Sequence, residues 1–250
     1  PENSDMHADF CMLLFKLAGL DESIKGEKTL RKGTKNGFTF PQFYGDYYGN
    51  NAVSLFGWAD LKTKNGKIVP DSGMKIRGDV PVGRHIRENG IKTFEQFKAH
   101  VGKIEDDMWK RRFKQYKKWR DNQYNWYLKH GYVTILSGFV CKGIMTRNAT
   151  INYPIQGVCF HALLWSIIQL NKEIKKRGMK TKLIFQVHDE VVTDVPKEEY
   201  DDFMELMKKV MVHDIRDHFT FINTPLELKA EASAVDGNWF EMETAMKYIH

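Results

Sequence analysis

Cysteine and long apolar runs are scarce in this 250-residue chain. Its three cysteines, Cys11, Cys141 and Cys159, are widely spaced, and none belongs to a Cys-x-x-Cys pair. This pattern argues against a disulfide framework and a zinc site, and it favours a reducing compartment. The sequence has no run of about 18 apolar residues and no signal peptide, so we expect a cytoplasmic protein with no membrane association.

The remaining composition is that of a globular protein without repeats or low-complexity segments. Hydrophobic residues make up 42% and aromatic residues 13%, which is enough for a sizeable core in one or two domains. The net charge of +6 and the isoelectric point near 9.0 suit a polyanionic partner, although many basic proteins bind no nucleic acid.

Apolar periodicity predicts a largely helical first half. A helix is expected over residues 5–18, ended by Gly19, and loops with short elements over residues 60–92. A capping box at residues 93–96 opens a long helical region that extends to about residue 130 and is bent at Gly102.

The second half predicts strands and helices. We expect a strand or hairpin over residues 132–140, a helix that begins near Pro154 and ends before Gly178, and a hairpin over residues 183–193. A helix opened by Pro196 follows, and a strand over residues 226–232 completes the sheet. The fold class is therefore α+β, with a helical part followed by an antiparallel sheet and packed helices.

Basic and aromatic side chains alternate between Lys110 and Arg120. One interpretation is a solvated charged face whose aromatic residues turn toward the core. The other is a face that contacts phosphates, and the sequence leaves both open.

Three ionisable residues, His188, Asp189 and Glu190, interrupt an apolar, β-branched run near the C-terminal end. A tight hairpin would place all three at one edge of a sheet, where carboxylates could bind a metal ion. The alternative is that they only keep a turn soluble.

The segment from Gln186 to Glu190 resembles the last motif of family A DNA polymerases, the family of bacterial DNA polymerase I and many phage replicative enzymes. Four further segments resemble landmarks of that family in the same order: Asp5-Met6-His7, the run from Arg31 to Gly45, the run from Asn152 to Gly157, and Pro225-Leu226 with Gly237-Asn238-Trp239. The resemblance spans essentially the whole chain. It implies helical fingers over residues 1–140 and the C-terminal part of a palm over residues 141–250.

The resemblance implies a role for each motif residue in the second half. Asp189 would bind the two catalytic Mg²⁺ ions, Glu190 would be an auxiliary catalytic carboxylate, and His188 would contact the primer backbone. The residues implied to contact template or primer DNA are Arg147, which is one residue off the family spacing, Asn152 and Gln156.

In the fingers, a triphosphate needs cations spaced by about one helical turn, and Arg31 and Lys35 have that spacing. The resemblance implies that both grip the triphosphate with His7, that Phe40 and Tyr44 border the nucleotide, and that Gly45 admits the template DNA. The alternatives are ordinary surface cations and an aromatic core cluster.

The fingers motif has one residue too many between Lys35 and Tyr44, and Pro41 falls where a helix interior is expected. Either the helix ends before Phe40 or it carries a bulge, because proline costs about 3 kcal/mol inside a helix. Counting back from Tyr44 would move the phosphate contacts to Lys32 and Asn36. We prefer Arg31 and Lys35, since this choice keeps both cations.

The family's first catalytic Asp lies upstream of the Asp-x-His stretch, and this chain begins just before Asp5. Two ions roughly 3.5 to 4 Å apart need more carboxylates than one hairpin supplies. We therefore expect a split enzyme or a processed fragment, completed by a polypeptide with the first Asp, the thumb and an exonuclease if one exists, in the host cytoplasm if a phage encodes it. The alternatives are a non-catalytic primer-template-binding or scaffolding module and, third, a single-subunit RNA polymerase.

Overall fold

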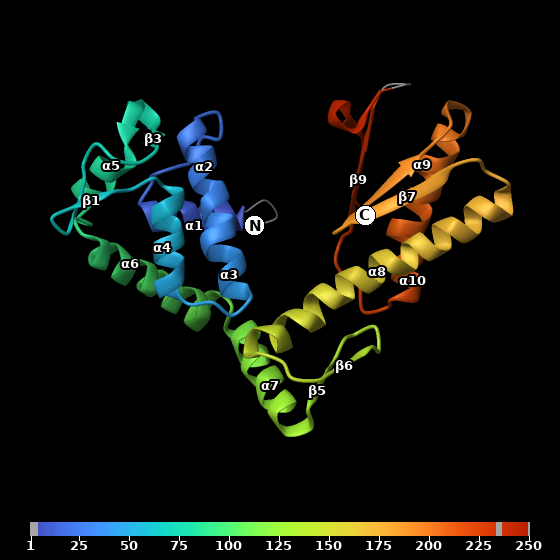
Figure 1. Ribbon diagram of the computed structural model, residues 1–250, viewed down its shortest axis with the longest axis horizontal. Helices are drawn as coiled ribbons and strands as arrows, with labels where there is room; N and C mark the ends of the chain where they lie inside the picture. Colours follow the sequence, from blue (N-terminus) through green and yellow to red (C-terminus); the bar gives the residue numbers. More distant parts are fainter. Residues whose placement is uncertain (1–4, 234–236, 250) are drawn as a thin grey trace. The chain divides into compact units, whose positions relative to one another are not determined.

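The chain divides into two compact units, each described here by itself. A computed structural model describes residues 5–233 and 237–249 (Figure 1). The first unit contains the residues up to 130 together with residues 144–151, and the second contains residues 131–143 and the residues from 152 onward. The chain thus passes from one unit to the other after residues 130, 143 and 151, whereas the sequence suggested a single boundary at residue 140.

Helices dominate the first unit, and two short hairpins lie between them. The helices are α1 (Met6–Phe15), α2 (Lys25–Thr34), a π-helical turn (Lys35–Thr39), α3 (Phe40–Phe43), α4 (Tyr48–Trp58), α5 (Val82–Glu88), α6 (Phe94–Asp107), a second π-helical turn (Met108–Arg112) and α7 (Lys114–His130). The hairpins pair β1 (Thr63–Lys64) with β2 (Lys67–Ile68) and β3 (Lys75–Ile76) with β4 (Val80–Pro81), and a 3₁₀ turn at Arg77–Asp79 joins the latter two. Buried side chains of α1, α2, α4 and α6 form one core, with Phe10, Leu30, Leu55 and Phe97 among them.

Two predicted boundaries in this unit were wrong. Helix α1 ends at Phe15 rather than near Gly19, because Lys16 adopts a left-handed backbone with φ of 56° and its Nζ donates to the carbonyl of Asn89. The long helical region breaks at Phe113 rather than bending at Gly102. The capping box at Thr93 and Gln96 is confirmed.

The second unit combines hairpins with helices. Its elements are β5 (Tyr132–Thr134), β6 (Val140–Lys142), most of α8 (Arg147–Arg177), β7 (Lys182–Val187), β8 (Glu190–Asp194), a 3₁₀ turn (Lys197–Glu199), α9 (Tyr200–Lys208), a π-helical turn (Lys209–Asp214), α10 (Ile215–His218), β9 (Glu227–Ala232), a 3₁₀ turn (Trp239–Glu241) and β10 (Glu243–Ile249). Leu170 and Ile174 of α8 pack against Phe203 and Leu206 of α9. This contact places the long helix beside the shorter one (Figure 1).

The structure confirms the α+β class and the hairpins, and it corrects two predictions in this unit. Helix α8 begins at Arg147, because the hydroxyl of Thr146 accepts the backbone N–H of Ala149, so Pro154 lies inside the helix rather than at its start. Strand β9 pairs with β10 and not with the β7–β8 hairpin. Within the described residues, every sheet is therefore two-stranded.

Helix α8 is long and apolar, yet most of its apolar stretch is not buried. Among the described residues it has the length and composition needed to cross a membrane, a test that core helices also pass. Only 22% of its most apolar stretch is buried.

A buried amide fixes the end of the predicted fingers motif to the helices that follow. The side-chain Nε2 of Gln42 donates to Asn51 Oδ1 at 2.6 Å and to a carboxylate oxygen of Glu105, while its Oε1 accepts from Trp109 Nε1 at 2.7 Å. Arg120 donates to the Gln42 carbonyl at 2.8 Å, and its guanidinium lies 4.4 Å from the centroid of the Trp109 ring. Because Gln42 is fully buried, each unmade hydrogen bond would cost about 1 to 3 kcal/mol.

This network makes stability depend on pH through Glu105. Burial raises the pKa of Glu105 above its ordinary value of 4.5, and the hydrogen bond from Gln42 only partly opposes that rise. The folded state therefore holds the proton more tightly than the unfolded state, and this carboxyl favours folding less as the pH rises above about 4.5. We predict that Glu105→Gln becomes increasingly more stable than the natural chain between acidic and neutral pH.

Denaturant unfolding across this pH range measures the difference. The control is Glu95→Gln on the same helix, where the side chain is exposed and no such gain is expected. The prediction would be contradicted if the free energy of unfolding of Glu105→Gln, relative to that of the natural chain, fell as the pH rose.

Candidate active site

Asp5 organises the first cluster of predicted site residues. It caps α1, and its Oδ1 accepts the backbone N–H groups of His7 at 2.9 Å and Ala8 at 3.1 Å. Its Oδ2 accepts two N–H groups of Arg31, one of them Nε at 2.7 Å. Because Glu22 also lies 3.2 Å from the Arg31 Nε, the guanidinium is held between two carboxylates.

The charges of this cluster shift the pKa of two groups in it. Burial alone would raise the pKa of Asp5, but the hydrogen bond from Ala8 and the Arg31 guanidinium lower it overall. Burial lowers the pKa of His7, and the positive charges of Arg31 and Lys35 lower it further. The Asp5 carboxylate opposes this, but the net lowering of the His7 pKa favours the neutral imidazole, and its buried Nδ1 has no hydrogen-bond partner in the described part of the chain.

The extra residue of the fingers motif is taken up by the π-helical turn at Lys35–Thr39. The backbone N–H of Phe40 donates to the carbonyl of Lys35, five residues earlier, so the chain gains one residue per turn here. Pro41 is the second residue of α3, directly after this turn. Of the two explanations for the spacing, the bulge is the one that the structure contains.

This turn brings the aromatic and cationic residues together. Phe40 contacts His7 edge-on with 5.6 Å between ring centroids, and the centroid of Tyr44 is 6.1 Å away. The Lys35 Nζ lies 5.1 Å from the centroid of Phe40. A cation, a neutral imidazole and an aromatic ring are thus adjacent, and Arg31 joins them through Asp5. This arrangement can bind an anion that carries an aromatic or sugar group.

Gly45 follows this cluster and approaches a residue that the sequence reasoning missed. Its φ of +96° is a left-handed backbone conformation that favours glycine, and a Cβ at this position would lie 2.5 Å from Oδ1 of Asn148. Arg147, the neighbour of Asn148, donates to Asp121 Oδ1 at 2.6 Å on α7. The one-residue offset of Arg147 was the only sequence signal near Asn148.

The predicted catalytic carboxylate lies at the tip of the β7–β8 hairpin in the second unit. Val187 pairs with Glu190, which leaves His188 and Asp189 as the turn, and His188 has a left-handed φ of 52°. Gln186 Nε2 donates to the His188 carbonyl at 2.5 Å and supports that turn. His188, Asp189 and Glu190 are all exposed, as the hairpin prediction required.

Hard oxygen ligands such as these suit Mg²⁺. Among the residues that the structure describes, no group of three or more His, Cys, Asp or Glu side chains is arranged to hold a metal ion. The donor types at Asp189 and Glu190 therefore fit magnesium, while a complete site for two ions needs further carboxylates.

Asn152 and Gln156 lie one turn apart on α8. The Oδ1 of Asn152 is buried without a hydrogen-bond partner in the described residues, while Gln156 is exposed. Gly157 allows the β5–β6 hairpin to pack closely, since a Cβ there would lie 2.4 Å from Cδ1 of Ile135. This packing gives Gly157 a structural role beside the implied contacts of Gln156 with DNA.

The structure thus assembles the predicted site residues in two groups. His7, Arg31, Lys35, Phe40 and Tyr44 form one contact cluster in the first unit, and Gly45 and Arg147 belong to the same unit. The residues at 152, 156 and 188–190 belong to the second unit.

Comparisons with known proteins point to one family. The sequence model described as DNA polymerase family A matches residues 102–241, more than half of the chain. DNA polymerase I of Lactococcus lactis subsp. cremoris is 44% identical over 73 residues, and that of Chloroflexus aurantiacus is 30% identical over 124 residues. These matches cover 29% and 46% of this chain but only 8% and 12% of the relatives.

A solved structure has the same fold over most of the chain. It is the POL domain of Pol1 from M. smegmatis in complex with DNA primer-template and dNTP, with a TM-score of 0.52 and 17% identity. The match covers 83% of this chain and 31% of that one. Since the family model matches most of the chain and the fold is shared, the chain belongs to DNA polymerase family A.

Proposed function

We propose that this chain is the C-terminal fingers and palm portion of a template-directed DNA polymerase, completed by another polypeptide or segment. The first compact unit would be the fingers and the second the end of the palm, acting in the cytoplasm. The observation that carries the proposal is the π-helical turn, because it keeps Arg31, Lys35, Phe40 and Tyr44 in one cluster despite the extra residue.

The first unit would hold the incoming dNTP. Arg31 and Lys35 would neutralise the triphosphate while its α-phosphorus is attacked, and neutral His7 would donate a hydrogen bond to a phosphate oxygen. Asp5 and Glu22 orient the Arg31 guanidinium before the nucleotide binds. Phe40 and Tyr44 would border the sugar and the base pair.

The second unit would act on the primer end. Asp189 would bind Mg²⁺, which lowers the cost of charge at the reacting phosphate, and Glu190 would be an auxiliary carboxylate. His188 would contact the primer backbone, and Asn152 and Gln156, together with Arg147 of the first unit, would contact DNA near the growing end. In the reaction the primer 3′-hydroxyl attacks the α-phosphate, a new phosphodiester bond forms, and pyrophosphate leaves.

Asp189→Asn tests whether the protein is an enzyme. In the complete assembly we expect primer extension to fall by several orders of magnitude, because the amide cannot replace a carboxylate as a metal ligand. Primer-template affinity should change little. Extension assays and binding titrations measure the two effects, and an unchanged extension rate would favour the non-catalytic binding or scaffolding module instead.

A pair of lysine variants tests the register of the fingers helix. A charged hydrogen bond to the triphosphate contributes roughly 1.5 to 3 kcal/mol, so Lys35→Ala should raise the nucleotide KM or lower kcat about tenfold or more. Lys32 is exposed, and Lys32→Ala should be nearly silent. Nucleotide incorporation kinetics distinguish the two registers. Unchanged kinetics in Lys35→Ala together with impaired kinetics in Lys32→Ala would show that Lys32 and Asn36 occupy the phosphate-binding positions.

An exposed apolar stripe on α8 supports the proposal that a further polypeptide completes the palm. Phe160, Leu164 and Ile168 recur at four-residue spacing along one side of the helix and are 45%, 40% and 45% exposed. Ile184 of the β7–β8 hairpin is 51% exposed. A two-stranded hairpin is only marginally stable by itself. Additional strands that carry the first catalytic Asp would pair with this hairpin and bury these exposed apolar side chains.

We therefore predict that the 250-residue chain alone does not extend a primer. Activity should appear when a polypeptide with the first Asp is added, and Leu164→Glu should block that gain by placing a charge in the interface. Lys172→Glu, at an exposed position on the same helix, is the matched control. Robust incorporation by the chain alone would contradict the prediction, and binding of the natural chain but not Leu164→Glu to lipid vesicles would assign the stripe to a membrane.

A further inference from the structure

Arg31, which is proposed to bind the triphosphate, contacts two carboxylates that hold it in different ways. Asp5 accepts two N–H groups of the guanidinium, one of them Nε at 2.7 Å. Glu22 lies on the turn before α2, and its Oε1 is 3.2 Å from the same Nε. The Nε carries one hydrogen, which Asp5 accepts at the shorter distance, so Glu22 contributes charge rather than a second strong hydrogen bond.

The two carboxylates also differ in how firmly they are fixed. Asp5 caps α1 and accepts the backbone N–H groups of His7 and Ala8 as well. The Glu22 side chain is 50% exposed, and among the described residues Arg31 is its one ion-pair partner. Exposed ion pairs are weak, because water screens them and a long side chain loses freedom when it forms one. An anion can therefore displace Glu22 more easily than Asp5.

The backbone on either side of Glu22 is anchored, so only its side chain needs to move. The N–H of Asp21 donates to Glu27 Oε2 at 2.6 Å, and Asp21 Oδ1 accepts the N–H of Ser23 at 3.0 Å and its hydroxyl at 2.7 Å. Glu27 is buried and also accepts the N–H of Arg77 at 2.9 Å. Rotation of the Glu22 side chain would free Arg31 while the turn stays in place, so the carboxylate can return.

The charges around Arg31 explain why Glu22 has to leave. The cluster holds the cations Arg31 and Lys35 and the carboxylates Asp5 and Glu22, while the lowered pKa of His7 favours its neutral form. These charges cancel as long as Glu22 is in place, which gives a triphosphate little electrostatic attraction. Departure of Glu22 would leave a net positive charge and would expose one side of the Arg31 guanidinium.

We propose that Glu22 is a displaceable counter-ion of Arg31, which the triphosphate replaces on binding and which returns to Arg31 as pyrophosphate leaves. The proposal rests on the proposed function, since it takes Arg31 and Lys35 as triphosphate contacts. Glu22 acts through Arg31 and is therefore a positioning residue. Its removal should strengthen the binding of anions that extend over both cations. A nucleoside monophosphate should be nearly unaffected, because Lys35 can hold a single phosphate and has no carboxylate within ion-pair distance in the described part of the chain.

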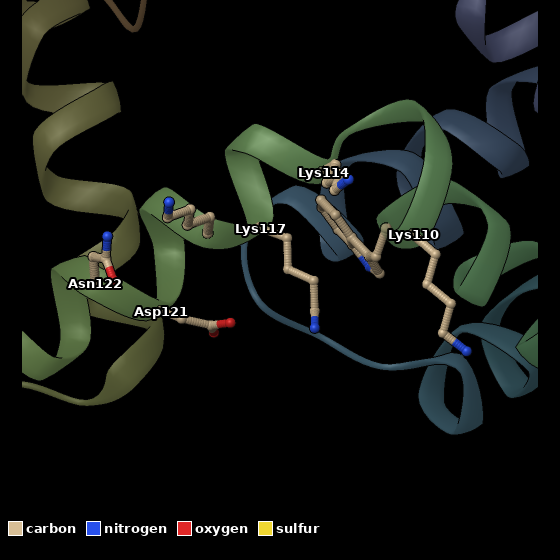
Figure 2. A pocket seen from close by; sticks show the side chains of 7 residues that line it. Lys110, Lys114, Lys117, Asp121 and Asn122 are labelled. Carbon is tan, nitrogen blue, oxygen red and sulfur yellow. The ribbon is translucent and has the colours of Figure 1, made fainter.

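The first unit has a second place where a polyphosphate could bind, and the experiment has to separate the two. An open hollow of about 400 Å³ on α7 and the turn before it is lined by Trp109, Lys110, Lys114, Lys117, Lys118, Asp121 and Asn122 (Figure 2). Tyr116 of the same segment turns inward and donates to the Phe43 carbonyl at 3.1 Å, as one interpretation of the basic and aromatic sequence expected. Loss of binding in Lys35→Ala but not in Lys117→Ala would assign nucleotide binding to the Arg31 cluster.

Glu22→Gln in the full 250-residue chain tests the proposal. Binding of dTTP, pyrophosphate and dTMP is measured by competition with a fluorescent deoxynucleoside triphosphate, at low salt and with a chelator so that no metal ion takes part. We expect the affinity for dTTP and pyrophosphate to rise about threefold or more, and the affinity for dTMP to change by less than about twofold. Glu22→Asp keeps the charge on a shorter side chain and should give a smaller gain. A purely structural role of Glu22 predicts a loss of affinity instead.

The matched control is Glu88→Gln, which removes the same charge at an exposed position of the same unit. An unchanged or lower dTTP affinity in Glu22→Gln, an equal gain in Glu88→Gln, or an equal gain for dTMP would each overturn the proposal. If Lys35→Ala weakens dTTP binding and Glu22→Gln leaves it unchanged, only the counter-ion is wrong and the nucleotide site stands. If Lys35→Ala leaves dTTP binding unchanged, the nucleotide site itself is wrong.

Discussion

The arrangement of the predicted nucleotide-binding residues in the first unit depends on how the chain accommodates one extra residue between Lys35 and Tyr44. A regular α-helix could not hold it, because Pro41 has no N–H to donate and the residues on either side would rotate out of line. The π-helical turn accommodates the extra residue, and Pro41 follows it as the second residue of α3. Lys35, the first residue of the turn, still contacts Phe40, and Phe40 still contacts Tyr44.

The inserted turn is held by packing beyond the helix itself. Gln42 lies three residues after the turn, and its amide is hydrogen-bonded by Asn51, Glu105 and Trp109, which come from three other elements. The hydrogen bonds within a π-helical turn specify its backbone conformation less strongly than those of a regular α-helix do. Contacts with α4, α6 and α7 therefore specify the conformation of this turn. Helix α7 contributes to this through Tyr116 and Arg120, which donate to the carbonyls of Phe43 and Gln42.

The fold and the motifs differ in how far the sequence predicts them. The capping box at Thr93 and the β7–β8 turn are local, and each is specified by neighbouring residues, so both were predicted correctly. The start of α8 was missed because Thr146 competes with Pro154 as a helix opener, and both are acceptable near an N-terminus. The partner of β9 was missed because strand pairing depends on contacts distant in sequence.

By itself the sequence determined the family, the order of its motifs and the residue types that phosphoryl transfer needs. These are properties of spacing and chemistry that can be identified along the chain. Only the tertiary structure decided how the extra residue is accommodated, that Arg31 is held by Asp5 and Glu22, and that Asn148 lies against Gly45. These features depend on side chains from separate elements meeting at hydrogen-bond distance, which packing and burial control and which one-dimensional spacing does not encode.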